Sequence, residues 1–166
     1  MGVHEPESPT TGLSRQESRE PEHQEWSSIM AVTLEQPARA RLIAPEGQER
    51  ALPVVLRYAA ADPLAVQITF PSQASLDGVE VTWIFARQLL EEGLVAPAGS
   101  GDVHVWPCGR ARTVLEFHSH QGLALVQFDK VTLRRFLTRS YAVVPAGEEE
   151  AGLDLDRGLS RLLDGV

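Results

Sequence analysis

The sequence is poor in cysteine and lysine, and it contains no long apolar run. Its single cysteine, Cys108, excludes an internal disulfide framework and is typical of a reducing compartment. No segment approaches the roughly 20 apolar residues that a membrane-spanning helix requires. The N-terminal residues lack the basic and apolar regions of a signal peptide. We therefore expect a soluble, cytoplasmic protein without a membrane span.

A basic surplus is also missing from the central part of the chain. The net charge of −8 comes from the two ends, since residues 1–29 and 146–166 each contain six acidic and two basic side chains. Residues 30–145 carry eleven of each sign and are neutral. A nucleic-acid-binding surface normally needs excess positive charge to displace phosphate counterions. Composition therefore disfavours nucleic acid as a partner.

The chain is long enough for one domain with a substantial core but hardly for two. Residues 1–29 are rich in Glu, Ser, Pro and Gln and have few apolar side chains. Such a segment cannot bury enough surface to offset the entropy of ordering, so we expect a disordered acidic N-terminal extension. Residues 30–166 are predicted to form a single domain.

The stretch 79–109 predicts a strand, a short helix and a second strand. Apolar residues alternate over 79–86, which predicts a strand with one buried face, and they then recur at helical spacing over 86–92. Gly93 is suited to the left-handed conformation that ends many helices. Alternation resumes over 102–106, and Pro107 is expected to stop that strand. The strand face predicted to be buried consists of Val79, Val81, Trp83 and Phe85.

The remaining pattern predicts five more strands and two further helices. The strands are expected at 32–43, 52–58, 64–70, 113–118 and 123–128, and the helices at 130–141 and 153–165. Pro37 lacks a ladder donor, which favours an edge position for the first strand. Leu64 falls on the predicted buried face of the third. The fold class is therefore α+β and β-rich, with antiparallel sheets of about seven to eight strands, a short helix between strands and two C-terminal helices.

Motifs for catalysis are absent from the sequence. His118 and His120 stand on one side of a strand end, but two ligands without a third are a weak metal signal. Cys108 and His104 lie four apart on one strand, about 13 Å, too far apart to form a nucleophile–base pair. We therefore predict no catalytic residues, no cofactor and no metal, and a protein that is not an enzyme.

Exposed arginines are the candidate partner-binding residues. The cations of the 130–141 helix form an ordinary solvated face, or they receive an acidic segment such as the chain's own tails. Trp83 and Trp106, with neighbouring arginines, would suit a stacking platform for single-stranded nucleic acid, although core tryptophans fit the neutral domain better. The candidate partner-binding residues are Arg87, Arg110, Arg134, Arg135 and Arg139.

The chain contains, in this order, Leu56-Arg57-Tyr58, Ala61-Asp62-Pro63, the runs 83–94 and 99–107, and Leu153-Asp154-Leu155-Asp156. Together these segments resemble the SsgA-like proteins of sporulating filamentous actinomycetes. The resemblance runs in order over about residues 30–165, and the SsgB type is the most similar subgroup. The N-terminal extension and the segments 72–78 and 108–112 depart from the family pattern, so the subgroup stays open. The family pattern is also matched at Ala65-Val66, Thr69-Phe70, Pro97, Leu159 and Leu162.

The resemblance implies a non-enzymatic role in cell division and sporulation. Members of the SsgB type mark future septum sites, recruit the tubulin-like FtsZ and promote its polymerisation together with SsgA-like paralogues. It also implies a whirly-like fold, a homotrimer and localisation at the cell septum. Fold alone does not imply function. The alternative is a single-stranded nucleic-acid-binding module on the same scaffold.

Overall fold

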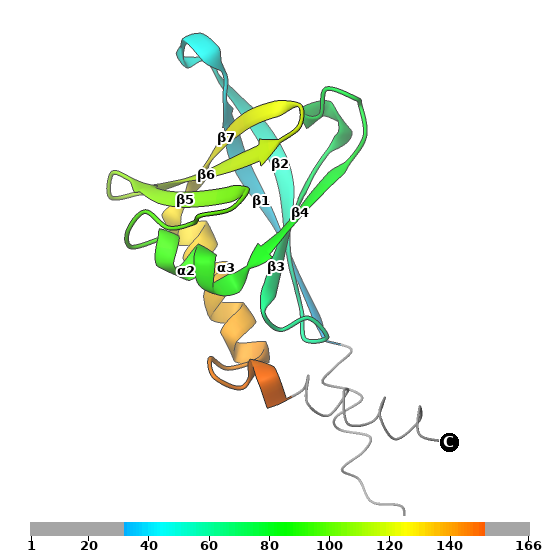
Figure 1. The fold of residues 1–166 in the computed structure, drawn as a ribbon, viewed down its shortest axis with the longest axis vertical. Coiled ribbons are helices and arrows are strands. Elements are labelled where there is room, and N and C mark those ends of the chain that lie inside the picture. The colour runs from blue at the N-terminus through cyan, green and yellow to red at the C-terminus, as the bar shows by residue number, and fades with distance from the viewer. Residues whose placement is uncertain (1–31, 152–166) are drawn as a thin grey trace, which may run out of the picture.

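The computed structural model describes residues 32–151. The predicted N-terminal extension and the helix predicted at 153–165 lie outside these residues. Within the described part, seven strands form one antiparallel sheet in the order β4-β3-β2-β1-β7-β6-β5 (Figure 1). This arrangement confirms the predicted α+β, β-rich class. The strands are β1 (Thr33–Ile43), β2 (Glu49–Ala59), β3 (Ala65–Phe70), β4 (Val81–Ala86), β5 (Val103–Cys108), β6 (Arg112–Ser119) and β7 (Gly122–Asp129).

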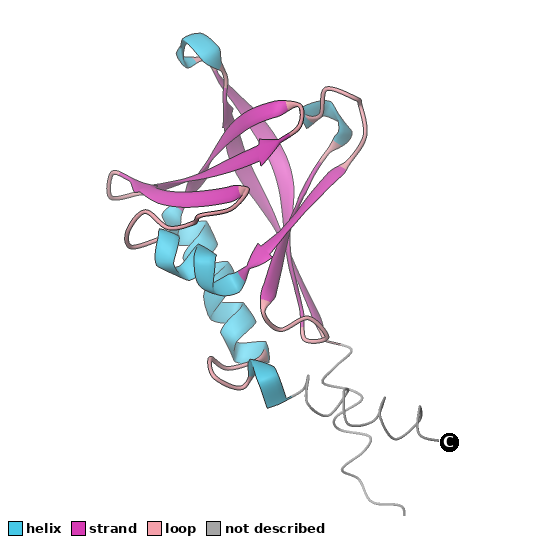
Figure 2. Ribbon diagram, viewed as in Figure 1, coloured by secondary structure: helices cyan, strands magenta, loops and turns pink. Residues whose placement is uncertain are grey.

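The two longest helices of the described residues lie together against one end of the sheet (Figure 2). α2 (Arg87–Gly93) leads from β4 toward β5, and α3 (Lys130–Val143) follows β7 directly. Two short 3-10 helices, η1 (Pro45–Gly47) and η2 (Ser72–Ala74), lie in connections between strands. No helix within residues 32–151 is long and apolar enough to cross a bilayer.

The sheet curls until strands from distant places in its order meet in the core. Phe117 of β6 contacts three aromatic rings from β3 and β4, at centroid distances of 5.0–6.4 Å. Antiparallel sheets twist and coil naturally, so a seven-stranded sheet can enclose its own apolar face. The three rings packed on Phe117 belong to Phe70, Trp83 and Phe85.

The unit 79–109 links the two edge strands, β4 and β5, through α2. The predicted left-handed conformation at Gly93 was wrong, because Gly93 is not among the positive-φ residues and Leu94 after it is also right-handed helical. Glycine is needed there for a different reason. A Cβ at Gly93 would collide with the side chain of Val105 on β5. The close approach of α2 to β5 therefore requires this residue.

Two further expectations about the strands were wrong. β1 lies between β2 and β7 rather than at an edge, but β7 pairs only with Ala40–Ile43. Pro37 therefore has a neighbouring strand on one side only, where a missing donor is tolerated. Pro107 does not stop β5, which runs to Cys108, because β5 is itself an edge strand.

Burial departs from strict alternation at the ends of strands. Leu64, just before β3, is 50% exposed, and Val79, before β4, is 61% exposed. Trp83 is half-buried rather than buried. By contrast, the helix expected at 130–141 is confirmed as α3, and its residues Leu133, Phe136 and Leu137 are buried.

Candidate functional site

Arg87 is the most deeply buried of the predicted partner-binding residues. Only 1% of it is exposed. Its guanidinium donates hydrogen bonds to the carbonyl oxygens of Ser140 (3.1 Å) and Val144 (2.9 Å), and to Glu149 Oε1 (2.8 Å). The expectation that Arg87 is a surface cation was therefore wrong, because α3 and the segment after it cover it.

Two tyrosines complete the surroundings of Arg87. Its guanidinium carbon lies 3.9 Å from the ring centroid of Tyr141 and 4.7 Å from that of Tyr58. Cation–π attraction of this kind is strongest where water is excluded. Burial and a hydrogen bond to Glu91 (2.6 Å) raise the pKa of Tyr141 to about 12. The cluster ties α2, β2 and α3 together and has a structural role.

Glu149 is held in its ionised form by this cluster. Its own backbone N–H contributes most to lowering the pKa of the carboxyl below its ordinary value. The hydrogen bonds from Arg87 and from the backbone N–H of Gly147 (2.6 Å) act in the same direction. Glu149 belongs to the acidic run 148–150, yet its side chain is only 17% exposed.

A surface groove of about 680 Å³ lies between β1, β2 and α3. Its walls carry Arg39 from β1 and Arg135 and Arg139 from α3, one helical turn apart. Two carboxylates also line it, but Asp129 is ion-paired with Arg112 at 3.3 Å. The full lining is Gln36, Pro37, Ala38, Arg39, Pro53, Val54, Val55, Thr69, Pro71, Glu80, Asp129, Thr132, Arg135 and Arg139.

Gln36 connects the groove wall to α3. This buried side chain donates a hydrogen bond to the carbonyl oxygen of Thr132 (3.1 Å) and accepts one from Arg139 (3.1 Å). Arg139 is thereby held in place. Arg135 is exposed and forms no ion pair or side-chain hydrogen bond within residues 32–151. Arg135 is the groove cation most available to an incoming carboxylate.

The other predicted cations lie outside this lining. Arg134 is exposed on α3 beside the groove. Arg110 is exposed in the turn between β5 and β6, and the N–H of Lys130 bonds the carbonyl of Ala111 (2.8 Å). That turn therefore lies near the N-terminal end of α3. Of the five predicted residues, the structure brings Arg135 and Arg139 together in one groove.

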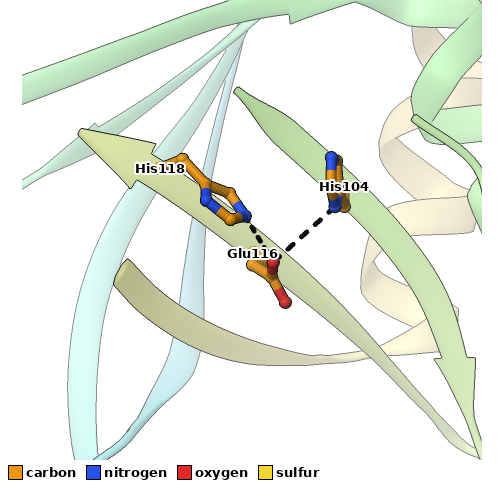
Figure 3. Close-up of side chains that lie close together, drawn as sticks. All are labelled: His104, Glu116 and His118. Atoms are coloured by element: carbon orange, nitrogen blue, oxygen red, sulfur yellow. Dashed lines mark hydrogen bonds and ion pairs between the residues drawn. The ribbon is translucent and has the colours of Figure 1, made fainter. Parts of the chain in front are cut away.

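The predicted histidine pair is separated, and a different cluster forms. His120 is exposed in the turn after β6, whereas His118 lies on β6 beside Glu116 and near His104 of β5 (Figure 3). One sequence signal could have identified this group. A hairpin centred on residue 110 pairs position 104 with position 116, as the register of β5 and β6 shows. The sequence analysis considered only neighbours on one strand.

An apolar cavity of about 360 Å³ lies under η2 and the turn between β6 and β7. Phe70, Trp83 and Phe117 contribute its aromatic walls. Ser119 and His120 also line it, but Ser119 Oγ donates its hydrogen bond to the carbonyl of Gly122 (3.3 Å). The hydroxyl therefore has no base as its acceptor, and this cavity does not present an activated nucleophile.

Relatives of known name cover most of the chain. The sporulation-specific cell division protein SsgB of Salinispora tropica is 42% identical over 142 residues, which are 84% of this chain and 99% of that protein. SsgB of Streptomyces coelicolor is 39% identical over 137 residues, or 81% of this chain and 98% of that protein.

Solved structures agree with the sequence relatives. An SsgA-like sporulation-specific cell division protein from Thermobifida fusca superposes with a TM-score of 0.71 at 31% identity, covering 80% of this chain and 96% of that one. An SsgB structure, described with mutations that correlate to longitudinal cell division during sporulation of Streptomyces coelicolor, gives 0.67 at 36% identity, covering 74% and 97%. The family model of the Streptomyces sporulation and cell division protein SsgA matches residues 52–149. The chain therefore belongs to the SsgA family of sporulation and cell division proteins.

Proposed function

We propose that this protein acts without catalysis, by docking proteins of the division machinery during sporulation septation, and that FtsZ is its principal partner. The family membership supports the process, since its named relatives are sporulation-specific cell division proteins. The groove between β1, β2 and α3 supports docking as the means. Under this proposal the protein localises to the septum and promotes FtsZ assembly.

The charge of the groove favours an acidic segment as the bound element. Arg39, Arg135 and Arg139 outnumber the two carboxylates of the lining, and Asp129 is already paired. Exposed Arg135 can form a bidentate contact with a carboxylate, which gives geometric specificity as well as attraction. The remaining lining is small and apolar or uncharged, so an extended peptide can lie along it.

Co-sedimentation of the full chain with FtsZ polymers tests this function. The wild type is expected to enter the pellet and to increase polymer yield or bundling. Arg135→Ser should weaken association several-fold, because it removes an exposed charge from the groove without breaking an internal contact. Arg134→Ser is the matched control, since it removes the same charge from the same helix outside the groove. No effect of the wild type on FtsZ polymers would refute the proposal, and equal effects of both variants would place the contact elsewhere.

Single-stranded nucleic acid is the alternative partner of the scaffold. The groove lining contains no aromatic side chain on which bases could stack. Trp83 packs on Phe117 in the core rather than projecting as a platform. A mobility-shift assay with single-stranded DNA at about 150 mM salt decides between the two partners. Tight binding that weakens steeply as the salt concentration rises would favour nucleic acid, because contacts to phosphates release counterions.

The family resemblance further supports a whirly-like homotrimer as the working unit. One chain has a mass of 18.2 kDa, so a trimer has about 55 kDa, three times that value. Light scattering on the purified full chain measures this directly. A measured mass of 18.2 kDa, that of one chain, at all concentrations used for co-sedimentation would contradict the trimer.

A further inference from the structure

Three side chains with metal-binding atoms converge on the hairpin of β5 and β6, apart from the groove. His104 lies directly opposite Glu116 in the register, and His118 follows Glu116 by two residues on the same face. Their ligand atoms all lie within 4.8 Å of one another. Both imidazoles and the carboxylate project toward each other (Figure 3).

The atoms in question are those that commonly bind zinc. His104 Nδ1 lies 3.6 Å from Glu116 Oε1, and His118 Nε2 is hydrogen-bonded to the same oxygen. Two atoms bound to one tetrahedral Zn²⁺ at about 2.0–2.1 Å lie roughly 3.3 Å apart. Small side-chain rotations would therefore bring all three atoms to bonding distance of a single ion.

The charge of Glu116 also points to a cation. Its side chain is only 19% exposed, and within residues 32–151 its ion-pair partners are the two histidines alone. No arginine or lysine of these residues neutralises it, although arginine pairs several other carboxylates of the domain. A largely buried carboxylate is stabilised by a compensating positive charge. A bound divalent ion would supply that charge.

The hairpin positions the ligands before any ion binds. The segment 96–101 lies beside His104 on β5. In this segment Ala98 exchanges two backbone hydrogen bonds with Val105, the residue after His104 (2.8 and 2.9 Å). A Cβ at Gly99, which has φ +111°, would approach His104 Cδ2 to 3.2 Å. The loop thus packs tightly on the imidazole. Ligands on paired strands lose little freedom on binding a metal, which favours affinity.

We propose that His104, Glu116 and His118 form a Zn²⁺ site. Two imidazoles and one carboxylate are a recurrent three-ligand set for zinc, with a fourth position left for water or an external ligand. His104 and His118 are 35% and 43% exposed, so the fourth position faces solvent. An ion there would join edge strand β5 to β6.

Zinc titration of the metal-stripped full chain tests the site. The wild type is expected to bind one Zn²⁺ per chain and to gain thermal stability. His104→Ala, Glu116→Gln and His118→Ala should each weaken binding at least about tenfold. His120→Ala, Cys108→Ser and the double change of His4 and His23 to Ala are controls that should leave binding unchanged. These controls cover the remaining histidines and the only thiol of the chain.

Circular dichroism of the metal-free variants checks that each is folded. A measurement on the wild type needs no variant, because Zn²⁺ should shift the NMR signals of the His104 and His118 rings but not those of His120. Absence of zinc binding, binding unaffected by His104→Ala and His118→Ala, or binding lost in a control variant would overturn the proposal. The three groups would then be a hydrogen-bonded cluster only.

Discussion

The guanidinium of Arg87 lies 2.8 Å from the carboxylate of Glu149, although 62 positions separate them in the chain. Arg87 is the first residue of α2, and Glu149 follows α3. The contact therefore closes the segment after α3 onto the helix that links the two edge strands. Arg87, which the sequence analysis placed among the exposed arginines, is therefore part of the buried interior of the domain.

Arg87→Ala is expected to destabilise the fold strongly. The change leaves Glu149 without its cation and the carbonyl oxygen of Val144 without the guanidinium donor, whereas the carbonyl of Ser140 still accepts from the Val144 N–H. Breaking a buried ion pair from one side costs about 3–5 kcal/mol. Chemical denaturation measures the free energy of unfolding. Arg57→Ala is the control, because its pair with Glu35 (2.7 Å) is about half exposed and such pairs contribute about 0–1 kcal/mol. Similar losses in both variants would contradict the structural role of Arg87.

Acidification should weaken the contact at Glu149. Its pKa in the folded chain lies below the ordinary value of 4.5, so its contribution to stability is complete above pH 4.5. That contribution disappears as pH falls through the lower folded-state pKa. The stability difference between the wild type and Glu149→Gln is therefore expected to shrink below pH 4.5. Denaturation at a series of pH values measures this difference. A difference that grows on acidification would contradict the prediction.

The tyrosine beside Arg87 should resist ionisation. Burial and the hydrogen bond to Glu91 together raise the pKa of Tyr141 to about 12. Tyr58→Phe leaves Tyr141 as the only tyrosine, so ultraviolet titration reports its ionisation directly. Adding Glu91→Gln to that background should lower the pKa of Tyr141, because the carboxylate no longer opposes the phenolate. An unchanged titration would show that the hydrogen bond does not form in solution.

The close approach of α2 to β5 makes Gly93 sensitive to any side chain. Gly93→Ala places a methyl group against Val105, and overpacking of this kind costs about 1–3 kcal/mol. Gly101→Ala is a matched control in the loop before β5, where a Cβ would meet no atom within 4 Å. We expect the control to change the free energy of unfolding by less than about 0.5 kcal/mol. Thermal melts of both variants provide the comparison.

Much of the local structure could be predicted from the sequence. Alternation over 102–106 identified β5, and the pattern over 130–141 identified α3, whose Leu133, Phe136 and Leu137 are buried. Both patterns depend on fixed periods of about 2 and 3.6 residues, so a single sequence displays them. The family could be recognised too, since its motifs occur in order along the chain.

The candidate sites were harder to predict, because each depends on residues distant in sequence. Arg139 is held at the groove by a hydrogen bond to Gln36, which is 103 positions away in the chain. His104 lies beside Glu116 because β5 and β6 pair in one particular register. Helical spacing showed that Arg134, Arg135 and Arg139 share a helix. It could not show that Arg135 and Arg139 line a groove while Arg134 does not.

The sequence by itself determined the approximate positions of the strands and of α2 and α3, the neutral charge of residues 30–145, and the family. Each of these depends on short-range spacing, on composition or on motifs in order along the chain. Only the tertiary structure decided that β1 is central, that Arg87 is buried and that His104, Glu116 and His118 converge. These outcomes depend on how the sheet curls and which strands pair. Strand register and packing depend on turn geometry and on many weak contacts across the chain, and the spacing within one strand or helix does not fix them.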